Sequence, residues 1–434
     1  MRVWACWCLM AVGLGAQEHS MAAPDQAERA WIASKMYSVL QANFAHWEAV
    51  PDLDLDSRYR EYLQDAVAAQ GRRDFSLASM RFLASLGNGH TNFYDDSLRY
   101  WEGHSTGFSL VRLGDRWVVA QTVLEGLARG DVVIAIDGRP FDDFFADRGR
   151  YISVSSEAAR VRHLFYNPYL FPPTFTLGLD DGRTLEIERK RKQRSAKQPP
   201  KPMEAGLLEE GVFYLPIRSF GKPEIEKAAI ETIRQNREVS TLIIDVRGNG
   251  GGTTPTQLIE ALMDRPWRGW TSATPQVTGL ESAYAHLAKT LDDGKMSERI
   301  RGYLDAYQGA DRRMLFTAGS VNQPRDPLFT NRLIVLVDER CASACEGFVM
   351  PLRVSGRATL VGRATGGSSG QPYLYDFGNG MRFRVSTKRM YFPDGSQFEG
   401  VGVAPHVLVP LTVETLRSPA DEDLNRALRL ARGQ

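Results

Sequence analysis

A serine stands where an apolar strand gives way to a run of small helix-forming residues. Leu333–Val337 is continuously apolar, and the segment Cys341–Phe348 that follows contains Ser343. A serine in such a turn projects its hydroxyl beyond the sheet. The N–H of Ala344 would lie at a helix start, where unpaired donors and the helix dipole favour negative charge. The pattern predicts a nucleophile, Ser343, and one oxyanion-binding N–H group, that of Ala344, although the G-x-S-x-G motif is absent.

A second strand-to-helix turn, Asp245–Thr253, is rich in glycine. Nucleotide binding is the main alternative for such a turn. However, Thr253 occupies the place of the third glycine of the dinucleotide motif, and the lysine of the P-loop is absent. Glycines also let backbone N–H groups approach an anion closely. Because sites in open α/β sheets form beyond the carboxyl ends of the strands, we predict that Gly250 or Gly251 supplies a second oxyanion donor.

A serine nucleophile needs a base, and the base needs an orienting partner. Among the 7 histidines, His90 lies in a glycine-punctuated turn after an amphipathic helix, which makes it the candidate base. The alternative for a loop histidine is a surface residue. Arg247, in the glycine-rich turn, has two interpretations, binding of a substrate carboxylate or a structural ion pair. The histidines are scattered and H-E-x-x-H is absent, so we expect no metal and no cofactor.

The N-terminus has the features of a secretory signal. Arg2 is followed by the apolar run Val3–Leu14, which is too short to span a bilayer, and small residues follow. We predict a signal peptide over residues 1–23, export to the periplasm or the extracellular space, and no stable membrane insertion after its removal. An uncleaved anchor or a buried first helix is the alternative. The net charge of +1 gives no electrostatic case for binding nucleic acid.

Removal of the signal leaves two cysteines, Cys341 and Cys345, which flank Ser343. The usual interpretation of such residues is small buried side chains. An oxidising compartment permits a disulfide between them without requiring one.

The elements that must position these residues follow from hydrophobic periodicity and turn signals. Residues 24–100 have helical spacing, and residues 104–192 form a β-rich unit. A polar, proline-rich linker follows at 193–203. Residues 204–434 form an α/β layer with parallel strands, and 265–325 is a lid or an inserted helical subdomain. The alternating strands and helices of the layer are Val212–Ile217, Ile225–Asn236, Leu242–Val246, Pro255–Met263, Leu333–Val337 and Ala344–Leu352.

Four segments, in order along the chain, resemble one family: Gly89–Thr91, Asp245–Gly252, Ala342–Glu346 and Phe392–Pro405. The family is the serine peptidases that include the C-terminal processing proteases, the tricorn core and the interphotoreceptor retinoid-binding protein. The resemblance implies a crotonase-like α/β layered catalytic domain, preceded by a helical segment and a PDZ-like domain.

The β-rich unit carries its own resemblance. Gly126–Asp131 followed by Ile134–Gly138 resembles a PDZ domain, and Gly107 and Phe108 lie where such a domain has its carboxylate-binding loop. PDZ domains capture an extended chain at a sheet edge, so these residues are candidates for substrate binding. The alternative is a β-rich spacer that binds nothing.

The resemblance also distinguishes between two sets of catalytic residues that the family uses. The processing-protease branch pairs its serine with a lysine, but Ser368 stands at that position here. The tricorn-like branch uses a histidine and a glutamate, which fall on His90 and Glu399. Glu399 could instead be an exposed carboxylate at a strand end. Gly89 replaces the serine before the tricorn histidine, so we expect Glu399 to reach His90 directly or through water.

These observations together predict an exported serine endopeptidase that cuts polypeptide substrates through an acyl-enzyme. Ser343 would be the nucleophile, His90 the general base and then acid, and Glu399 the orienting carboxylate. The alternative is a non-catalytic carrier of an apolar ligand, or a peptide-binding protein, on the same fold. The sequence leaves the oligomeric state open.

Overall fold

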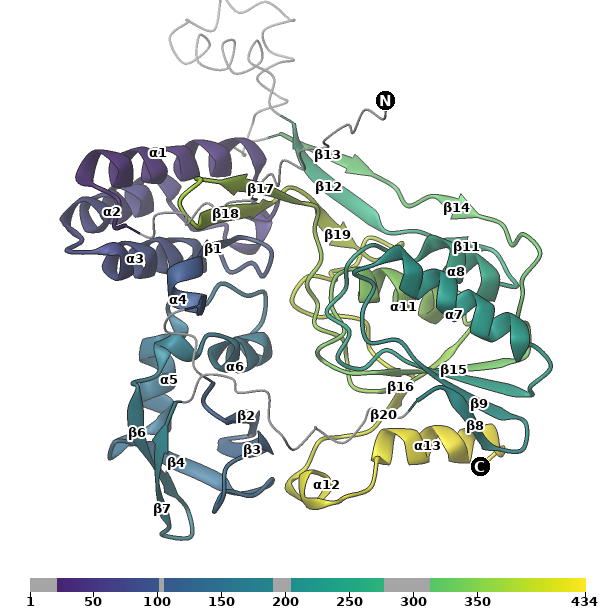
Figure 1. Ribbon diagram of the computed structural model, residues 1–434. Helices are drawn as coiled ribbons and strands as arrows, with labels where there is room; N and C mark the ends of the chain where they lie inside the picture. The colour runs from purple at the N-terminus through teal and green to yellow at the C-terminus, as the bar shows by residue number, and fades with distance from the viewer. Residues whose placement is uncertain (1–21, 101–104, 190–203, 277–312) are drawn as a thin grey trace, which may run out of the picture.

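The computed structural model describes residues 22–100, 105–189, 204–276 and 313–434 (Figure 1). The predicted linker, nearly all of the predicted signal peptide and much of the predicted insertion at 265–325 therefore lie outside the described residues. No helix in the described ranges combines the length and the hydropathy that crossing a bilayer requires.

A six-stranded sheet organises the C-terminal half, in the order β20-β16-β15-β10-β9-β8. All neighbouring pairs in it are parallel except the edge pair β8 and β9. The predicted alternation of strands and helices is confirmed, and the fold is mixed α/β. The strands are β8 (Gly206–Glu209), β9 (Val212–Pro216), β10 (Thr241–Asp245), β15 (Arg332–Val337), β16 (Thr359–Gly362) and β20 (Val407–Leu408).

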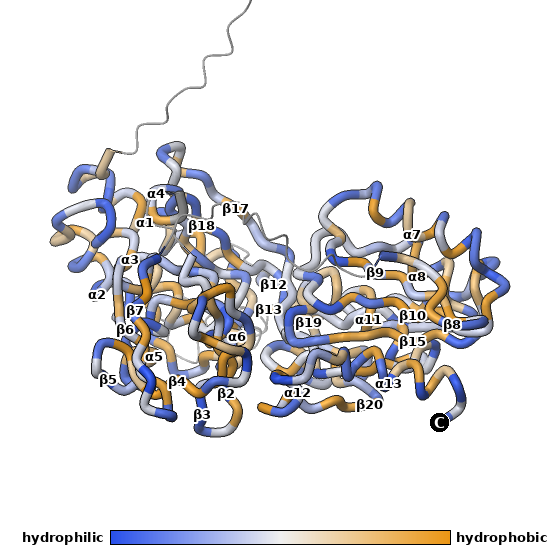
Figure 2. The backbone as a smooth tube through the Cα atoms, turned by 60° about the horizontal axis from the view of Figure 1, so that its bottom comes forward, coloured by the Kyte–Doolittle hydropathy of each residue, from blue (hydrophilic) through white to orange (hydrophobic). Residues whose placement is uncertain are grey.

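Helices cover both faces of this sheet (Figure 1). One face packs under α7 (Pro223–Gln235), α8 (Thr256–Leu262) and α11 (Ala344–Val354), and the other under α13 (Glu422–Ala431), which follows the short α12 (Val413–Arg417). Strands buried on both faces are continuously apolar, and Figure 2 shows this along β10 and β15. Asp245 pairs in register with Leu336, so the turns after β10 and β15 emerge at the same sheet edge.

The N-terminal segment consists of helices α1, α2 and α3, then β1 and the short α4. Strand β1 pairs antiparallel with β18, which in turn pairs with β17, so a hairpin from the C-terminal half completes the N-terminal region (Figure 1). The turn that carries His90 is thereby held between α3 and a strand from the other end of the chain. The bounds are α1 (Gln26–Asn43), α2 (Leu55–Ala68), α3 (Arg72–Ala84), β1 (Asn92–Asp95), α4 (Asp96–Tyr100), β17 (Pro372–Asp376) and β18 (Met381–Ser386).

The β-rich unit forms a sheet in the order β2-β3-β4-β6-β7, with β5 beside β4. The unit is rich in strands, as the sequence predicts, but the helices α5 and α6 between β5 and β6 were not predicted. Its PDZ-like character stays a prediction. The bounds are β2 (Phe108–Leu113), β3 (Arg116–Thr122), β4 (Val132–Ile136), β5 (Arg139–Pro140), α5 (Phe141–Gly149), α6 (Glu157–Tyr166), β6 (Thr174–Leu179) and β7 (Thr184–Glu188).

The described parts of the predicted lid or helical insertion are strands. Strand β12 pairs with β13 and with β19, and β11 pairs with β14. The remainder of that prediction lies outside the described residues. The bounds are β11 (Trp267–Arg268), β12 (Thr271–Gln276), β13 (Arg313–Thr317), β14 (Val321–Asn322) and β19 (Arg389–Tyr391).

Candidate active site

Ser343 occupies the turn between β15 and α11, as the sequence predicts. Its backbone has φ of 58°, in the left-handed region that non-glycine residues rarely adopt. Such a conformation costs on the order of 1–3 kcal/mol and persists only where the surroundings hold it. The Ser343 N–H is held twice, by the Ser368 carbonyl at 2.9 Å and by Glu346 Oε2 at 2.9 Å.

A disulfide joins Cys341 to Cys345 across this turn, and both cysteines are fully buried. The prediction of two small buried side chains is confirmed, and the disulfide that the sequence left open is present. Cys341 precedes the helix, and the turn at Ser343 brings its Cα within 5.4 Å of that of Cys345, a separation that a disulfide can span. The nucleophile therefore sits inside a covalently closed turn.

The glycine-rich turn lies directly against the nucleophile turn. A Cβ at Gly251 would fall 2.9 Å from the Ala344 nitrogen and 2.7 Å from the Ala342 oxygen, so only glycine fits there. Gly251 itself donates its N–H to Asn249 Oδ1 at 2.9 Å. The N–H groups of Gly250 and Ala344 donate to no acceptor within the described residues. Of the candidate oxyanion donors, these two are the available pair.

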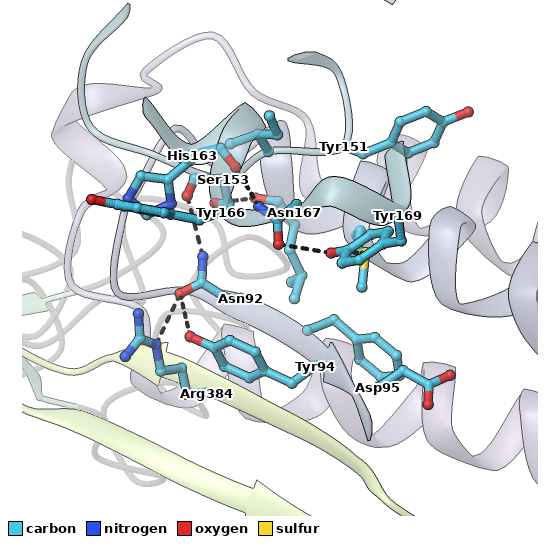
Figure 3. Close-up of a pocket in the computed structure, with 14 residues that line it drawn as sticks. Asn92, Tyr94, Asp95, Tyr151, Ser153, His163, Tyr166, Asn167, Tyr169 and Arg384 are labelled. Carbon is cyan, nitrogen blue, oxygen red and sulfur yellow. Dashed lines mark hydrogen bonds between the residues drawn. The ribbon is translucent and has the colours of Figure 1, made fainter. Parts of the chain in front are cut away.

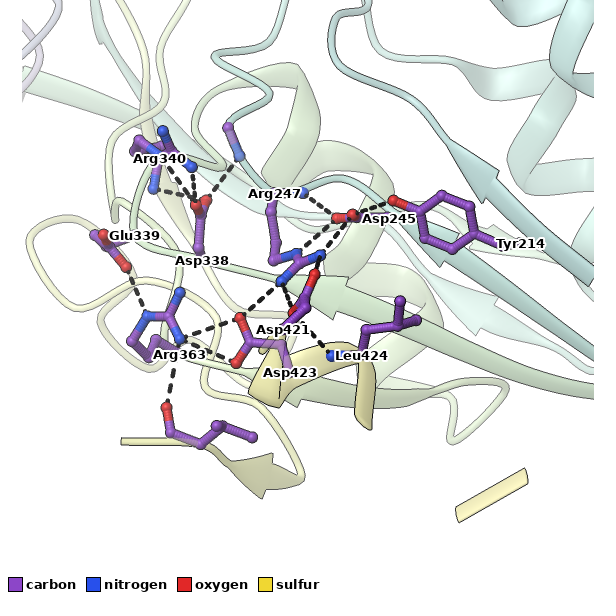
Figure 4. A network of polar contacts seen from close by, with 12 residues as sticks. Tyr214, Asp245, Arg247, Asp338, Glu339, Arg340, Arg363, Asp421, Asp423 and Leu424 are labelled. Carbon is purple, nitrogen blue, oxygen red and sulfur yellow. Dashed lines mark hydrogen bonds and ion pairs between the residues drawn. The ribbon is translucent and has the colours of Figure 1, made fainter. Parts of the chain in front are cut away.

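Arg247 is enclosed by carboxylates rather than open to a ligand (Figure 4). Its guanidinium bonds to Asp245 on β10 and to Asp421 and Asp423 at the start of α13, at 2.7–3.1 Å. The two arginines Arg218 and Arg247 together hold the pKa of the buried Asp245 well below its usual range, against the effect of burial. These contacts favour the structural ion pair among the two interpretations of Arg247.

Glu346 ends one of the four segments that resemble the peptidase family, but it was not predicted as a site residue. Its carboxylate is fully buried and accepts four hydrogen bonds, from the Ser343, Gly367 and Ser368 N–H groups and the Thr365 hydroxyl, at 2.5–3.1 Å. Burial raises the pKa of Glu346 to about 8, although the hydrogen bonds act in the opposite direction. The residue ties the nucleophile turn to the glycine and serine turn at 366–369.

His90 contacts that same turn from the other side. Its Nδ1 lies 3.0 Å from Ser368 Oγ. The His90 N–H donates to Asn88 Oδ1 at 3.0 Å. Burial, followed by the nearby charges of Arg384 and His163, lowers the pKa of His90 to about 3. The imidazole is therefore neutral at pH 7 and able to accept a proton.

Arg384 on β18 braces the His90 turn. Its Nη2 donates to the Gly89 carbonyl at 2.8 Å, and its Nε donates to Asn92 Oδ1 at 2.8 Å. Figure 3 shows this guanidinium in the wall of a cavity of about 210 Å³ that Tyr94 and Tyr166 also line. The brace comes from the hairpin that the C-terminal half contributes to the N-terminal region.

Glu399 is buried, so the interpretation as an exposed strand-end carboxylate is wrong. It accepts hydrogen bonds from Ser155 Oγ at 2.5 Å, from Asn88 Nδ2 at 3.1 Å and from the Ser369 N–H at 3.3 Å. Burial, the largest cause, raises the pKa of Glu399 to about 7.

No hydrogen bond of the described residues joins Glu399 to His90 directly. The Oγ atoms of Ser155 and Ser368 stand between them, 3.5 Å apart. Two hydroxyls from other parts of the chain therefore stand in the gap across which we expected Glu399 to reach His90 directly or through water. Likewise, no hydrogen bond between Ser343 Oγ and His90 occurs in the described part of the chain.

Gly107 and Phe108 lie at the start of β2, in the β-rich unit. Gly107 has φ of 80°, and its carbonyl accepts the Val123 N–H at 2.9 Å. Phe108 is buried and packs against Phe165 and Phe171. Substrate binding by these two residues stays a prediction.

Comparison with known proteins identifies the C-terminal half. A model described as peptidase family S41 matches residues 211–409. We call these matched residues the S41 segment. It carries Ser343, Glu346, Ser368 and Glu399, whereas His90 and Ser155 lie outside it. No curated protein matches the chain.

Solved structures of low identity share the fold of almost the whole chain. Mature CPAF complexed with lactacystin has a TM-score of 0.66 and 16% identity, covering 94% of this chain and 99% of that one. The photosystem II D1 C-terminal processing protease has a TM-score of 0.50 and 18% identity, covering 90% and 98%. The S41 match supports a peptidase, and the solved structures show that the chain shares their fold.

Proposed function

We propose that the chain is an exported serine endopeptidase that hydrolyses polypeptides through an acyl-enzyme. Ser343 is the nucleophile, His90 the base and then the acid, and Glu399 the carboxylate behind the base. The observation that carries the proposal is the position of Ser368. Its carbonyl accepts the Ser343 N–H while its hydroxyl contacts His90 Nδ1, so one residue touches both the nucleophile and the base.

In the first half of the reaction, Ser343 Oγ attacks the carbonyl carbon of the scissile peptide bond. The neutral His90 takes the hydroxyl proton, which makes the oxygen nucleophilic. Negative charge develops on the substrate oxygen, and the N–H groups of Ala344 and Gly250 stabilise it. Each such donor is worth about 3 kcal/mol of barrier.

In the second half, the tetrahedral intermediate collapses and the C–N bond breaks. His90 returns its proton to the departing amine, and the acyl group stays on Ser343 as an ester. A water molecule then gives one proton to His90 while its oxygen attacks the ester. Collapse releases the carboxylic acid and regenerates the Ser343 hydroxyl.

Labelling with a fluorophosphonate tests the proposal. We expect the wild-type protein to be labelled on Ser343 near neutral pH and to cleave an unfolded protein, and Ser343→Ala to do neither. Circular dichroism would confirm that the variant is folded. Absence of labelling and of turnover in the folded wild type would favour the carrier of an apolar ligand instead.

Export is part of the proposal and has its own support. The disulfide between Cys341 and Cys345 suits an oxidising compartment such as the periplasm or the extracellular space. Sequencing the N-terminus of the protein recovered from a secreting host tests it. We expect cleavage between Gly15 and Ala23, and an intact N-terminus would contradict the prediction.

For the β-rich unit we propose capture of a polypeptide end. Strand β2 is an edge strand of its sheet, and α6 packs beside it, which suits addition of an extended peptide. In the Ser343→Ala protein, a labelled peptide with a free C-terminal carboxylate should bind more tightly than its amidated form. If the two peptides bind equally well, or if neither binds, the β-rich unit is a spacer rather than a site that captures polypeptide ends.

A further inference from the structure

We propose that Ser155 and Ser368 are positioning residues that connect Glu399 to His90 through two hydroxyl groups. The inference rests on the proposed function, since it concerns the base of that reaction. It goes beyond that function because neither serine belongs to the predicted site. Residue 89, beside the histidine, is a glycine and offers no hydroxyl of its own.

The four groups form a continuous chain from three regions of the molecule. Glu399 Oε1 lies 2.5 Å from Ser155 Oγ, which lies 3.5 Å from Ser368 Oγ, which lies 3.0 Å from His90 Nδ1. Ser155 comes from the segment between α5 and α6, His90 from the turn after α3, and the other two from the S41 segment. The connection therefore exists only when the three regions are docked.

Counting the hydrogens of the two hydroxyls gives the direction that the relay requires. A hydroxyl donates once. The short contact of Ser155 with Glu399 has the length of a bond to an ionised carboxylate, so its hydrogen is used there. Ser155 Oγ accepts from the Gly89 N–H at 3.0 Å. The geometry of its 3.5 Å contact with Ser368 Oγ suits donation by Ser155. Because the single hydrogen of Ser155 is already used on Glu399, the relay that we propose requires the Ser368 hydroxyl to turn and donate to Ser155. Ser368, having donated, accepts from His90 Nδ1.

This direction sets the tautomer of His90. With its proton on Nδ1, the neutral imidazole presents an unprotonated Nε2, the form that a serine base requires. When Nε2 takes the Ser343 proton, the positive charge of the imidazolium is balanced by the Glu399 carboxylate through the polarised hydroxyls. Glu399 thereby acts on the base without touching it.

Gly89 creates the space that the relay fills. A Cβ at residue 89 would lie 2.6 Å from Ser368 Oγ and 3.5 Å from Ser155 Oγ. A side chain at that position and the observed Ser368 rotamer exclude each other. The glycine does not have a positive φ, so the backbone itself would accept serine. A hydroxyl on residue 89 and the Ser368 hydroxyl would therefore occupy the same volume, and only one of them can be present.

Single substitutions test the relay by kinetics. We expect Ser155→Ala and Ser368→Ala each to lower kcat for a peptide substrate by about 10- to 100-fold, as loss of the Glu399 carboxylate should, because each change breaks the same connection. KM should stay within about twofold, because neither hydroxyl faces the substrate in this mechanism. The matched control is Ser156→Ala, which removes the adjacent hydroxyl that caps α6 by accepting the Ala159 N–H. It should lower stability and leave kcat unchanged.

An exchange variant separates the relay from general disruption. Gly89→Ser alone should lose activity, because its side chain meets Ser368 Oγ. Gly89→Ser combined with Ser368→Ala removes that overlap and returns a hydroxyl to the gap, so kcat should recover at least about fivefold over Ser368→Ala alone. Failure of the double variant to exceed Ser368→Ala would count against a role for the hydroxyl itself.

A tautomer measurement makes the inference independent of turnover. In the inactive Ser343→Ala protein, ¹⁵N chemical shifts of His90 should report the proton on Nδ1, and Ser368→Ala should reduce that preference. Wild-type kcat in both serine variants with an unchanged tautomer would overturn the relay, as would an equal loss in Ser156→Ala. If the wild-type protein fails to be labelled but the tautomer responds as expected, the proposed function fails while the relay stands.

Discussion

Ser343 and His90 sit in turns that differ in where their supporting contacts come from. The Ser343 turn is held by the Cys341–Cys345 disulfide and by Glu346, all within a few residues of it in sequence. The His90 turn is held by Arg384 and contacts Ser368, both more than 270 residues away. The nucleophile is organised mainly by its own sheet, and the base by contacts between regions.

Because the two turns are held by different contacts, the site can lose activity in two different ways. Loosening the contact between the N-terminal region and the S41 segment would separate His90 from Ser368 while leaving the Ser343 turn closed. Damage within the sheet would instead disturb the oxyanion donors. Variants on the two sides should therefore lose activity with different effects on stability.

The largest expected effect is on the base side. His90→Ala should lower the rate of fluorophosphonate labelling by at least about 10³-fold, because Ser343 loses its proton acceptor. Urea denaturation should change little, since within the described ranges the His90 side chain makes a single hydrogen bond, to Ser368. Labelling at the wild-type rate would mean that another group is the base.

On the sheet side, Arg247→Met should destabilise the protein. We expect a loss of about 3 kcal/mol in the free energy of unfolding, at the lower end for a broken buried ion pair because Arg218 still pairs with Asp245. Urea denaturation measures it. Arg237→Met, which removes an exposed pair with Glu238, is the control and should cost less than about 1 kcal/mol. If the two substitutions lower the free energy of unfolding equally, the contacts of Arg247 have no special structural role.

The pH dependence of kcat/KM sharpens the base side further. Glu399, with a pKa raised to about 7, becomes a carboxylate as pH rises through 7, so activity should rise there. His90, with a pKa lowered to about 3, stays neutral over that range and contributes no limb. Glu399→Gln should remove the limb and lower the plateau by about 10- to 100-fold. A limb near pH 7 that persists in this variant would belong to another group.

The smallest effect concerns the disulfide. Replacing both Cys341 and Cys345 by alanine should cost at most about 2 kcal/mol of stability, because the closed loop is short. Labelling should slow by less than about tenfold, since Glu346 still holds the Ser343 N–H. A complete loss of labelling in the folded double variant would show that the covalent closure, rather than the Glu346 contacts, keeps the nucleophile in place.

Much of the S41 segment could be predicted because its signals are local. The apolar strands, the glycines after β10 and the serine after β15 lie close together in sequence, and a parallel sheet brings its strand ends to one edge. Helices α5 and α6 were not predicted from the sequence because strand-forming segments surround them. The pairing of β1 with β18 could not be predicted because no local sequence pattern specifies a partner strand almost 300 residues away.

Residue types, spacing and periodicity pointed to Ser343 and His90 as candidates and to the α/β class, and the resemblance to the serine peptidase family added Glu399. Only the tertiary structure decided that Glu399 and Glu346 are buried, that Arg247 is enclosed by carboxylates, and that Ser155 and Ser368 fill the gap beside Gly89. Burial, hydrogen-bond partners and pKa depend on which distant segments pack together, and that packing is a property of the whole folded chain.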